Sequence, residues 1–247
     1  MRSPETCFED TALTQDKMTD LSLLGVGVYG IPEAARISRV PAAYIRRWLW
    51  GYKYQAQGQV QRMGPLWQPQ LPQIDEARAL TFKDLVEIQF VYRFRQQGIS
   101  LQTIRKTIGL ATELLDKTFP LSSVRFKTDG KEVFAQVIED PAERGYVFDL
   151  KTGQYLLDYV LDHLYDALEY SQFDELIRWW PLGKTRRVVV DPKRSFGRPI
   201  VLEGVQTNIL ASSVRDQSDL QAVADWYEIS QSSVSDALEF ERGLLAA

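Results

Sequence analysis

The stretch from residue 25 to 51, GVGVYGIPEAARISRVPAAYIRRWLWG, constrains the fold most, because two short helix-forming segments follow one another with only a tight break between them. Pro41 suits the first turn of the second segment, since its missing N–H would have no helical partner there. Ile45, Trp48 and Leu49 recur at helical spacing and are predicted to face the core. This layout is typical of a helix-turn-helix, whose second helix enters the DNA major groove.

Positive charge is concentrated around this stretch, although the net charge of the 247-residue chain is −4. Between residues 31 and 62 only Glu33 opposes the basic side chains, which are Arg36, Arg39, Arg46, Arg47, Lys53 and Arg62. A solvated helix face would explain such charge, but its coincidence with the helix-turn-helix favours DNA binding. We expect Tyr44, Arg46 and Arg47 nearest the bases. We expect Lys53 and Arg62, which lie in a predicted hairpin or wing at 52–71, to contact phosphates. The side of the module that carries Arg36 and Arg39 is expected to do the same.

A pair of longer helices is predicted after the wing. Thr81 and Asp84 form a capping-box-like start, Gly98 ends the first helix, and Ser100 can cap the second. The sequence LTFKDLVEIQFVYRFRQQGISLQTIRKTI resembles the corresponding section of the MerR family of transcriptional regulators, in which it follows a helix-turn-helix and wing in the same order. The resemblance covers roughly residues 28–117. VPAAYIRRWLWGY departs from the family's second helix, so no base contact is carried over.

The segment 121–180 has a different pattern. Strands at 124–126 and 133–138 are predicted to form a hairpin around Asp129-Gly130, with a third strand at 146–150 and a helix from Gly153 to about Tyr170. Three acids four residues apart on that helix, Asp158, Asp162 and Asp166, could serve a metal-dependent nuclease, but a solvated face is the favoured interpretation. The apolar stripe of the same helix is expected either to pack in the core of the chain or to form a dimer interface.

The C-terminal segment contains a second family pattern. Short strands are predicted at 188–190 and 200–201, and helices at 207–215, 220–227 and 232–242. VVVDPKRSFGRPIV and SDLQAVADWYEISQSSVSDALEFE resemble a small domain family found in VapB-type antitoxins, over about residues 186–242. The last two helices are predicted to form a second helix-turn-helix-like pair. The acidic residues of its last helix argue against this helix being the main one that enters the DNA groove. A second basic cluster precedes it, comprising Lys184, Arg186, Arg187, Lys193, Arg194 and Arg198.

Several function classes find no support in the sequence. Cys7 and His163 are the single cysteine and histidine, which rules out an internal disulfide and argues against a zinc site or a Ser–His–Asp triad. No nucleotide-binding loop or nucleophile elbow is present, so we expect no enzyme activity, no cofactor and no metal. No apolar run approaches a membrane span and the N-terminus shows no signal-peptide pattern, so a cytoplasmic protein is expected.

These observations predict a mainly α chain with small β elements, of the α+β class. The expected divisions are a flexible arm at 1–22, a MerR-like winged helix-turn-helix at 23–120, a central dimerisation or linker segment at 121–180, and an antitoxin-family domain at 181–247. The resemblances imply an antitoxin that binds operator double-stranded DNA as a homodimer, represses its own operon and neutralises a PIN-like ribonuclease toxin. The alternative is a MerR-like, ligand-responsive regulator without a toxin partner, with a small pocket in the 121–180 region.

Overall fold

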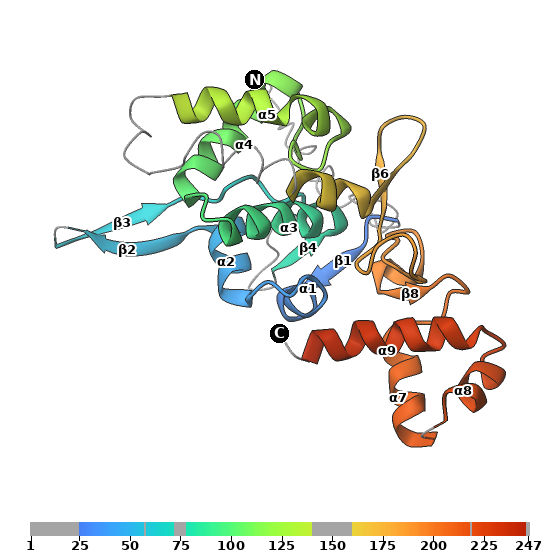
Figure 1. The fold of residues 1–247 in the computed structure, drawn as a ribbon. Helices are drawn as coiled ribbons and strands as arrows, with labels where there is room; N and C mark the ends of the chain where they lie inside the picture. The colour runs from blue at the N-terminus through green and yellow to red at the C-terminus, as the bar shows by residue number, and fades with distance from the viewer. Residues whose placement is uncertain (1–24, 57, 72–77, 140–159, 218, 246–247) are drawn as a thin grey trace, which may run out of the picture.

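The computed structural model describes residues 25–56, 58–71, 78–139, 160–217 and 219–245 (Figure 1). Within these residues helices surround small two-stranded antiparallel sheets, which confirms the predicted α+β class. The predicted N-terminal arm, the strand at 146–150 and Asp158 lie outside the described residues.

The N-terminal module, residues 28–115, has the predicted helix-turn-helix, hairpin and helix pair. Its elements are β1 (Val28–Gly30), α1 (Ile31–Ser38), α2 (Ala42–Trp50), β2 (Tyr52–Ala56), β3 (Gln59–Met63), β4 (Ala79–Thr81), α3 (Phe82–Gln96) and α4 (Leu101–Leu115). β1 pairs with β4, so the start of the helix-turn-helix lies beside the start of α3. The β2–β3 hairpin extends away from the body of the molecule (Figure 1).

The two longer helices begin at the predicted caps. The Thr81 hydroxyl accepts from the Asp84 N–H while the Asp84 carboxylate accepts from the Thr81 N–H, which completes a capping box. The Ser100 hydroxyl accepts from the Thr103 N–H at 2.9 Å at the start of α4. Both caps satisfy N–H groups that have no partner within the helix.

The predicted hairpin at 124–138 is wrong, because this segment forms helix α5 (Val124–Glu139). Phe126, Val133, Phe134 and Val137 are buried at helical spacing, and α5 packs against α4. Gly130 lies inside the helix, where its lack of a side chain admits the Phe126 ring. Packing of this apolar stripe overrides the turn preference of the Asp-Gly pair.

The predicted helix to Tyr170 ends earlier. Residues 160–166 are helical, but Leu168–Tyr170 forms β5, which pairs with β6 (Leu176–Trp179). Trp179 then bridges Val190, next to the paired strands β7 (Val188–Val189) and β8 (Ile200–Val201). The aromatic-rich segment therefore forms a hairpin that joins the central segment to the C-terminal part of the chain.

Three helices at the C-terminal end have their own small core. They are α7 (Thr207–Gln217), α8 (Leu220–Trp226) and α9 (Gln231–Leu245), close to the predicted bounds. The Ser230 hydroxyl accepts from the Ser233 N–H at 3.2 Å near the start of α9. The core of these C-terminal helices is formed around Val201, Leu210, Val223, Ala224, Val234 and Ala237.

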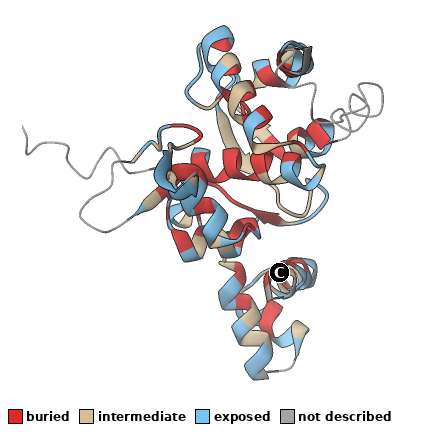
Figure 2. Cartoon of the chain, turned by 90° about the vertical axis from the view of Figure 1, so that its left-hand side faces the viewer, coloured by how far each residue is buried: buried red, intermediate tan, exposed pale blue. Residues whose placement is uncertain are grey.

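A larger hydrophobic core extends from Tyr29 to Val190, so the central segment shares one core with the N-terminal module. Figure 2 shows this buried interior in the main body, with the C-terminal helices projecting from it. The central segment is therefore packed as part of the main body.

One carboxyl group is buried completely inside this core. The Glu87 side chain on α3 accepts hydrogen bonds from the N–H and hydroxyl of Ser122, both at 2.8 Å. The second Glu87 oxygen has no hydrogen-bond partner among the described residues. The hydroxyls of Tyr165 and Tyr170 donate to the carbonyls of Leu121 and Ser122, so α3, the helix at 160–166 and β5 meet at this short loop. Burial raises the pKa of Glu87 to about 8.

This pKa predicts a specific pH dependence of stability. The folded state holds a proton on Glu87 that the unfolded state loses near its ordinary pKa, so the free energy of unfolding should fall as pH rises from about 5 to 8. The slope from this group is about 1.4 kcal/mol per pH unit. Glu87→Gln should remove the slope in denaturant titrations. Glu132→Gln, an exposed carboxylate on α5, should retain it; equal slopes in wild type and Glu87→Gln would contradict the prediction.

Candidate nucleic-acid interface

The turn between α1 and α2 is closed by local hydrogen bonds. The Ser38 hydroxyl accepts from the Val40 N–H at 3.2 Å and donates to the Ala34 carbonyl at 2.6 Å. Arg39 adopts a left-handed conformation with φ 58°, which reverses the chain direction before Pro41. The Pro41 carbonyl then accepts from the Tyr44 N–H at 2.8 Å in the first turn of α2.

The outer face of α2 carries the side chains predicted to lie nearest the bases. Ile45, Trp48 and Leu49 are buried, as their spacing predicts, whereas Arg46 and Arg47 are exposed. The half-exposed Tyr44 ring stacks on Trp48 with centroids 5.6 Å apart. The Arg47 guanidinium lies over the Tyr52 ring at 5.3 Å, and this cation–π contact positions Arg47 at the base of the hairpin. The helix therefore presents two exposed arginines, one of which, Arg47, is held over the Tyr52 ring.

The hairpin places two cations directly opposite each other. Lys53 pairs with Arg62 in the β2–β3 register, and both are exposed. Like charges at directly opposed positions destabilise a hairpin, and a bound phosphate would relieve the repulsion. Side chains alternate between faces along a strand, so Tyr52 and Tyr54 lie on the other face of the hairpin.

Contacts with α3 and α4 fix the hairpin relative to α2. Arg105 on α4 donates to the Gly64 carbonyl at 2.9 Å and also to the Pro65 carbonyl. The Leu66 N–H donates to the Trp48 carbonyl at 2.7 Å, and the Trp67 indole donates to Asp84 at 2.9 Å. These contacts join residues far apart in sequence, and the sequence pattern contains no signal for Arg105 or Trp67.

Arg36 and Arg39 lie on the side of α1 that faces α9. Arg36 forms an ion pair with Glu241 at 2.8 Å, and the other Glu241 oxygen accepts from the Thr207 hydroxyl. The Arg39 guanidinium packs against Gly243. The structure does not group these two arginines with Arg46 and Arg47. Phosphate contacts of these two arginines remain a prediction, and for Arg36 they would require its ion pair with Glu241 to break.

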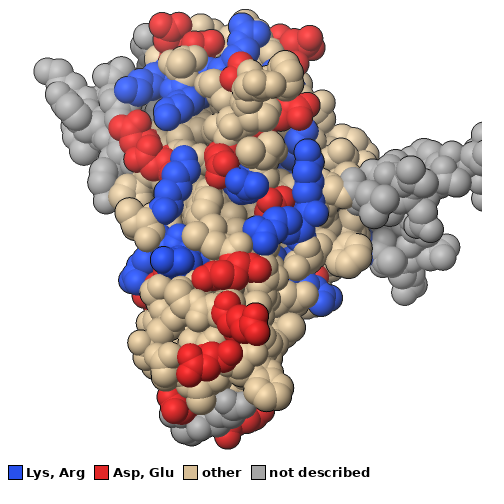
Figure 3. Space-filling model, turned by 90° about the vertical axis from the view of Figure 1, so that its right-hand side faces the viewer, with Lys and Arg blue, Asp and Glu red and all other residues tan. Residues whose placement is uncertain are grey.

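The second basic cluster holds the C-terminal helices in place. Arg186 pairs with Asp236 at 2.7 Å and Glu239 at 2.6 Å, and Arg198 approaches Glu33 of α1 at 3.4 Å. Figure 3 shows Lys and Arg over the upper part of this face and a series of Asp and Glu over the C-terminal part below. Within the cluster, Arg186, Arg187 and Arg198 therefore form ion pairs with carboxylates of the same chain.

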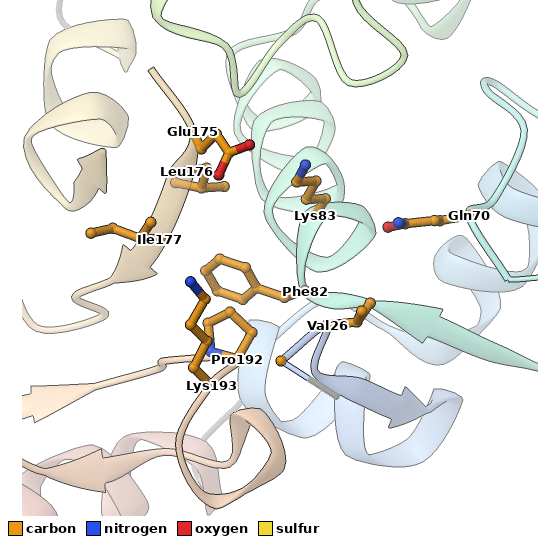
Figure 4. A pocket seen from close by; sticks show the side chains of 10 residues that line it. Val26, Gln70, Phe82, Lys83, Glu175, Leu176, Ile177, Pro192 and Lys193 are labelled. Atoms are coloured by element: carbon orange, nitrogen blue, oxygen red, sulfur yellow. The ribbon is translucent and has the colours of Figure 1, made fainter. Parts of the chain in front are cut away.

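A cavity of about 170 Å³ lies where the N-terminal module meets the β5–β6 hairpin and the β7–β8 connection. Phe82 and Pro192 form part of its apolar wall, and Lys193 points inward past Pro192 (Figure 4). Lys83 and Glu175 project at one side of the same space (Figure 4). Ammonium and carboxylate groups around an apolar wall suit a small charged molecule.

The described residues contain no group of three or more His, Cys, Asp and Glu side chains that could hold a metal ion. Asp162 and Asp166 are exposed, as the solvated-face interpretation predicts. The same residues contain no helix long and apolar enough to cross a membrane.

The fold is α+β, with two short helices, a hairpin and a pair of longer helices in the N-terminal module. No protein-family model and no curated protein matches the chain. Its structure is similar to the crystal structure of Rv2018 from Mycobacterium tuberculosis, with a TM-score of 0.65 and 23% sequence identity. The match covers 87% of this chain and 99% of that one, and it shows a shared fold.

The opposed cations predict a salt-dependent effect on stability. Lys53→Gln removes one of the two charges, so the variant should melt slightly above wild type in about 10 mM salt, where charges interact over long distances. The difference should vanish in about 1 M salt. Lys53→Arg preserves the repulsion and should melt like wild type at both ionic strengths. A Lys53→Gln midpoint equal to wild type at low salt would show that the cations do not repel.

Proposed function

We propose that this protein is the DNA-binding antitoxin of a toxin–antitoxin pair, which represses its own operon and neutralises a PIN-like ribonuclease. The observation that carries the DNA-binding part is the exposed face of α2 with Arg46 and Arg47, rigidly joined to a hairpin with two opposed cations. The antitoxin part rests on the resemblance of residues 186–242 to VapB-type antitoxins.

The dimensions of α2 are compatible with groove recognition. An α-helix with its side chains is about 10–12 Å across, which fits a B-DNA major groove about 12 Å wide. In this arrangement Tyr44, Arg46 and Arg47 approach base edges, while Lys53 and Arg62 approach the phosphates. A homodimer would place two α2 helices on half-sites about 34 Å apart.

The charge of the C-terminal helices supports a protein partner for this end of the chain. Residues 201–247 contain eight carboxylates against two arginines. Four of the eight pair with arginines outside this range, and the exposed Asp216, Asp219, Asp225 and Glu228 make the surface acidic. Phosphates are repelled by such a surface, whereas the RNA-binding surface of a ribonuclease is basic and complementary to it. The division of charge between the two ends thus favours DNA at one end and a protein at the other.

The second candidate is a ligand-responsive regulator without a toxin. The cavity near Lys83 and Lys193 favours it, because part of its lining comes from Glu175, Leu176 and Ile177 in the central segment. A small charged molecule there would contact the first turn of α3, which is joined to the hairpin through Asp84 and Trp67. The identity of the adjacent gene product distinguishes the two candidates.

Substitution of the α2 arginines tests the DNA-binding part. Arg46→Ala with Arg47→Ala should abolish the shift of the upstream promoter fragment, a loss of about a hundredfold or more in affinity. Wild-type affinity should fall steeply with salt, because phosphate binding releases counterions. Lys184→Ala with Arg242→Ala removes the same charge from exposed sites elsewhere and should retain the shift. Undiminished binding by the α2 variant would exclude α2 as the recognition helix.

Co-expression tests the antitoxin part. The adjacent gene product, expressed alone, should arrest growth, and co-expression of this chain should restore it because the two proteins form a complex. Recovery of the complex by affinity purification and size-exclusion chromatography provides the second measurement. An adjacent product that is harmless alone would contradict the antitoxin function and favour the ligand-responsive regulator.

A further inference from the structure

The cavity between the N-terminal module and the β5–β6 hairpin has walls that are joined to one another by hydrogen bonds. The buried Asp191 carboxylate accepts from the Arg178 guanidinium on β6 and from the Lys193 N–H, both at 2.9 Å. It therefore joins the β5–β6 hairpin to the β7–β8 connection. The Phe82 N–H donates to the Val26 carbonyl at 3.2 Å, which joins the start of α3 to the segment before β1.

Two glycines in the segment before β1 allow the walls to approach one another. Gly25 and Gly27 have φ values of 76° and 63°, a conformation that glycine adopts without steric cost. A Cβ atom at Gly25 would lie 3.3 Å from the Lys193 stem, and one at Gly27 would lie 3.2 Å from Pro192. The missing side chains therefore leave room for the Pro192-Lys193 pair beside the start of α3.

The size of the cavity limits what it can hold. Its volume is about 170 Å³. An apolar cavity of about 150 Å³ holds one benzene molecule, whereas pockets for drug-sized ligands have about 300 Å³ or more. The apolar part of the lining comes from the buried Phe82 and Pro192 and the partly buried Leu176 and Ile177. The space therefore suits an apolar body of about one six-membered ring and is too small for a nucleotide.

The charges of the lining favour an anion. Lys83 and Lys193 contribute two ammonium groups, and Glu175 is the one acidic residue that lines the cavity. Neither lysine forms an ion pair with any residue that the structure describes. Figure 4 shows Lys193 pointing into the space past Pro192, with Lys83 across it on α3. The net charge of the lining is therefore +1, which matches an anion with a single charge better than a phosphate with two.

We propose that this cavity binds a small monocarboxylate whose apolar body is about the size of one ring. The body packs against Phe82 and Pro192, and the carboxylate is held by the ammonium groups of Lys83 and Lys193. The inference deepens the second candidate function by naming the chemical class of its ligand. It rests on that function only for an effect on DNA, because binding itself is measured without DNA.

Titration of the purified full chain with sodium benzoate, followed by NMR chemical shifts, tests the proposal. Benzoate should bind with a dissociation constant of about 1 mM or tighter. Lys83→Gln and Lys193→Gln should each weaken binding about tenfold, because each removes a charge-assisted hydrogen bond. Lys184→Gln removes an exposed charge outside the cavity and should bind like wild type. All three variants should retain the wild-type melting temperature.

The neutral analogue benzyl alcohol separates recognition of the carboxylate from recognition of the ring. It should bind about tenfold more weakly than benzoate, since it fills the apolar part of the cavity without the charge. Equal binding of the two compounds would overturn the assignment of a carboxylate. The site itself would be refuted by an absence of benzoate binding up to about 20 mM, or by equal affinity in wild type and both cavity-lysine variants.

Promoter binding, measured with and without benzoate, separates this inference from the proposed function. A chain that binds the promoter but not benzoate would overturn the ligand site while DNA binding stands. Benzoate binding that depends on Lys83 and Lys193 but leaves promoter affinity unchanged would support the site and contradict the ligand-responsive regulator.

Discussion

The arrangement of the N-terminal module depends on the buried carboxylate of Asp84. It accepts hydrogen bonds from the Trp67 indole and from the N–H and hydroxyl of Thr81, each at 2.9 Å. Burial raises the pKa of Asp84, and the hydrogen bonds oppose that shift. One side chain therefore caps α3 and attaches the segment after the hairpin. A buried polar group left without its hydrogen-bond partner costs about 1–3 kcal/mol. These bonds therefore hold β4, α3 and the segment after the hairpin as one unit.

A second set of contacts joins this module to the C-terminal part of the chain, and its members differ in strength. The Arg36–Glu241 and Arg198–Glu33 pairs involve partly exposed arginines, and exposed ion pairs contribute about 0–1 kcal/mol each. The Tyr29–Gly197 hydrogen bond is buried, and the Tyr29 ring belongs to the main core. Tyr29 therefore contributes more to this attachment than either exposed ion pair.

The features predictable from sequence were those determined within a few residues of chain. Helical spacing identified the buried Ile45, Trp48 and Leu49, and hence which side of α2 is exposed, and the capping box identified the start of α3. The Asp-Gly pair at 129–130 led to the wrong prediction of a hairpin, because the packing of α5 against α4 outweighs a local turn preference. The environment of Arg36 could not be predicted, since Glu241 lies 205 residues away. The left-handed Phe196 depends in the same way on Tyr29, 167 positions earlier in the chain.

The position of these long-range contacts decides how the two ends of the molecule can influence each other. Tyr29, Glu33, Arg36 and Arg39 lie on β1, on α1 or at its C-terminal end, whereas Arg46 and Arg47 are exposed on α2. The contacts of the C-terminal part therefore fall on β1 and α1. Helix α1 in turn packs against α2, and Ala34, Ile37 and Ile45 lie in their shared core. Because of this packing, a displacement of the C-terminal part would act on α2 through α1.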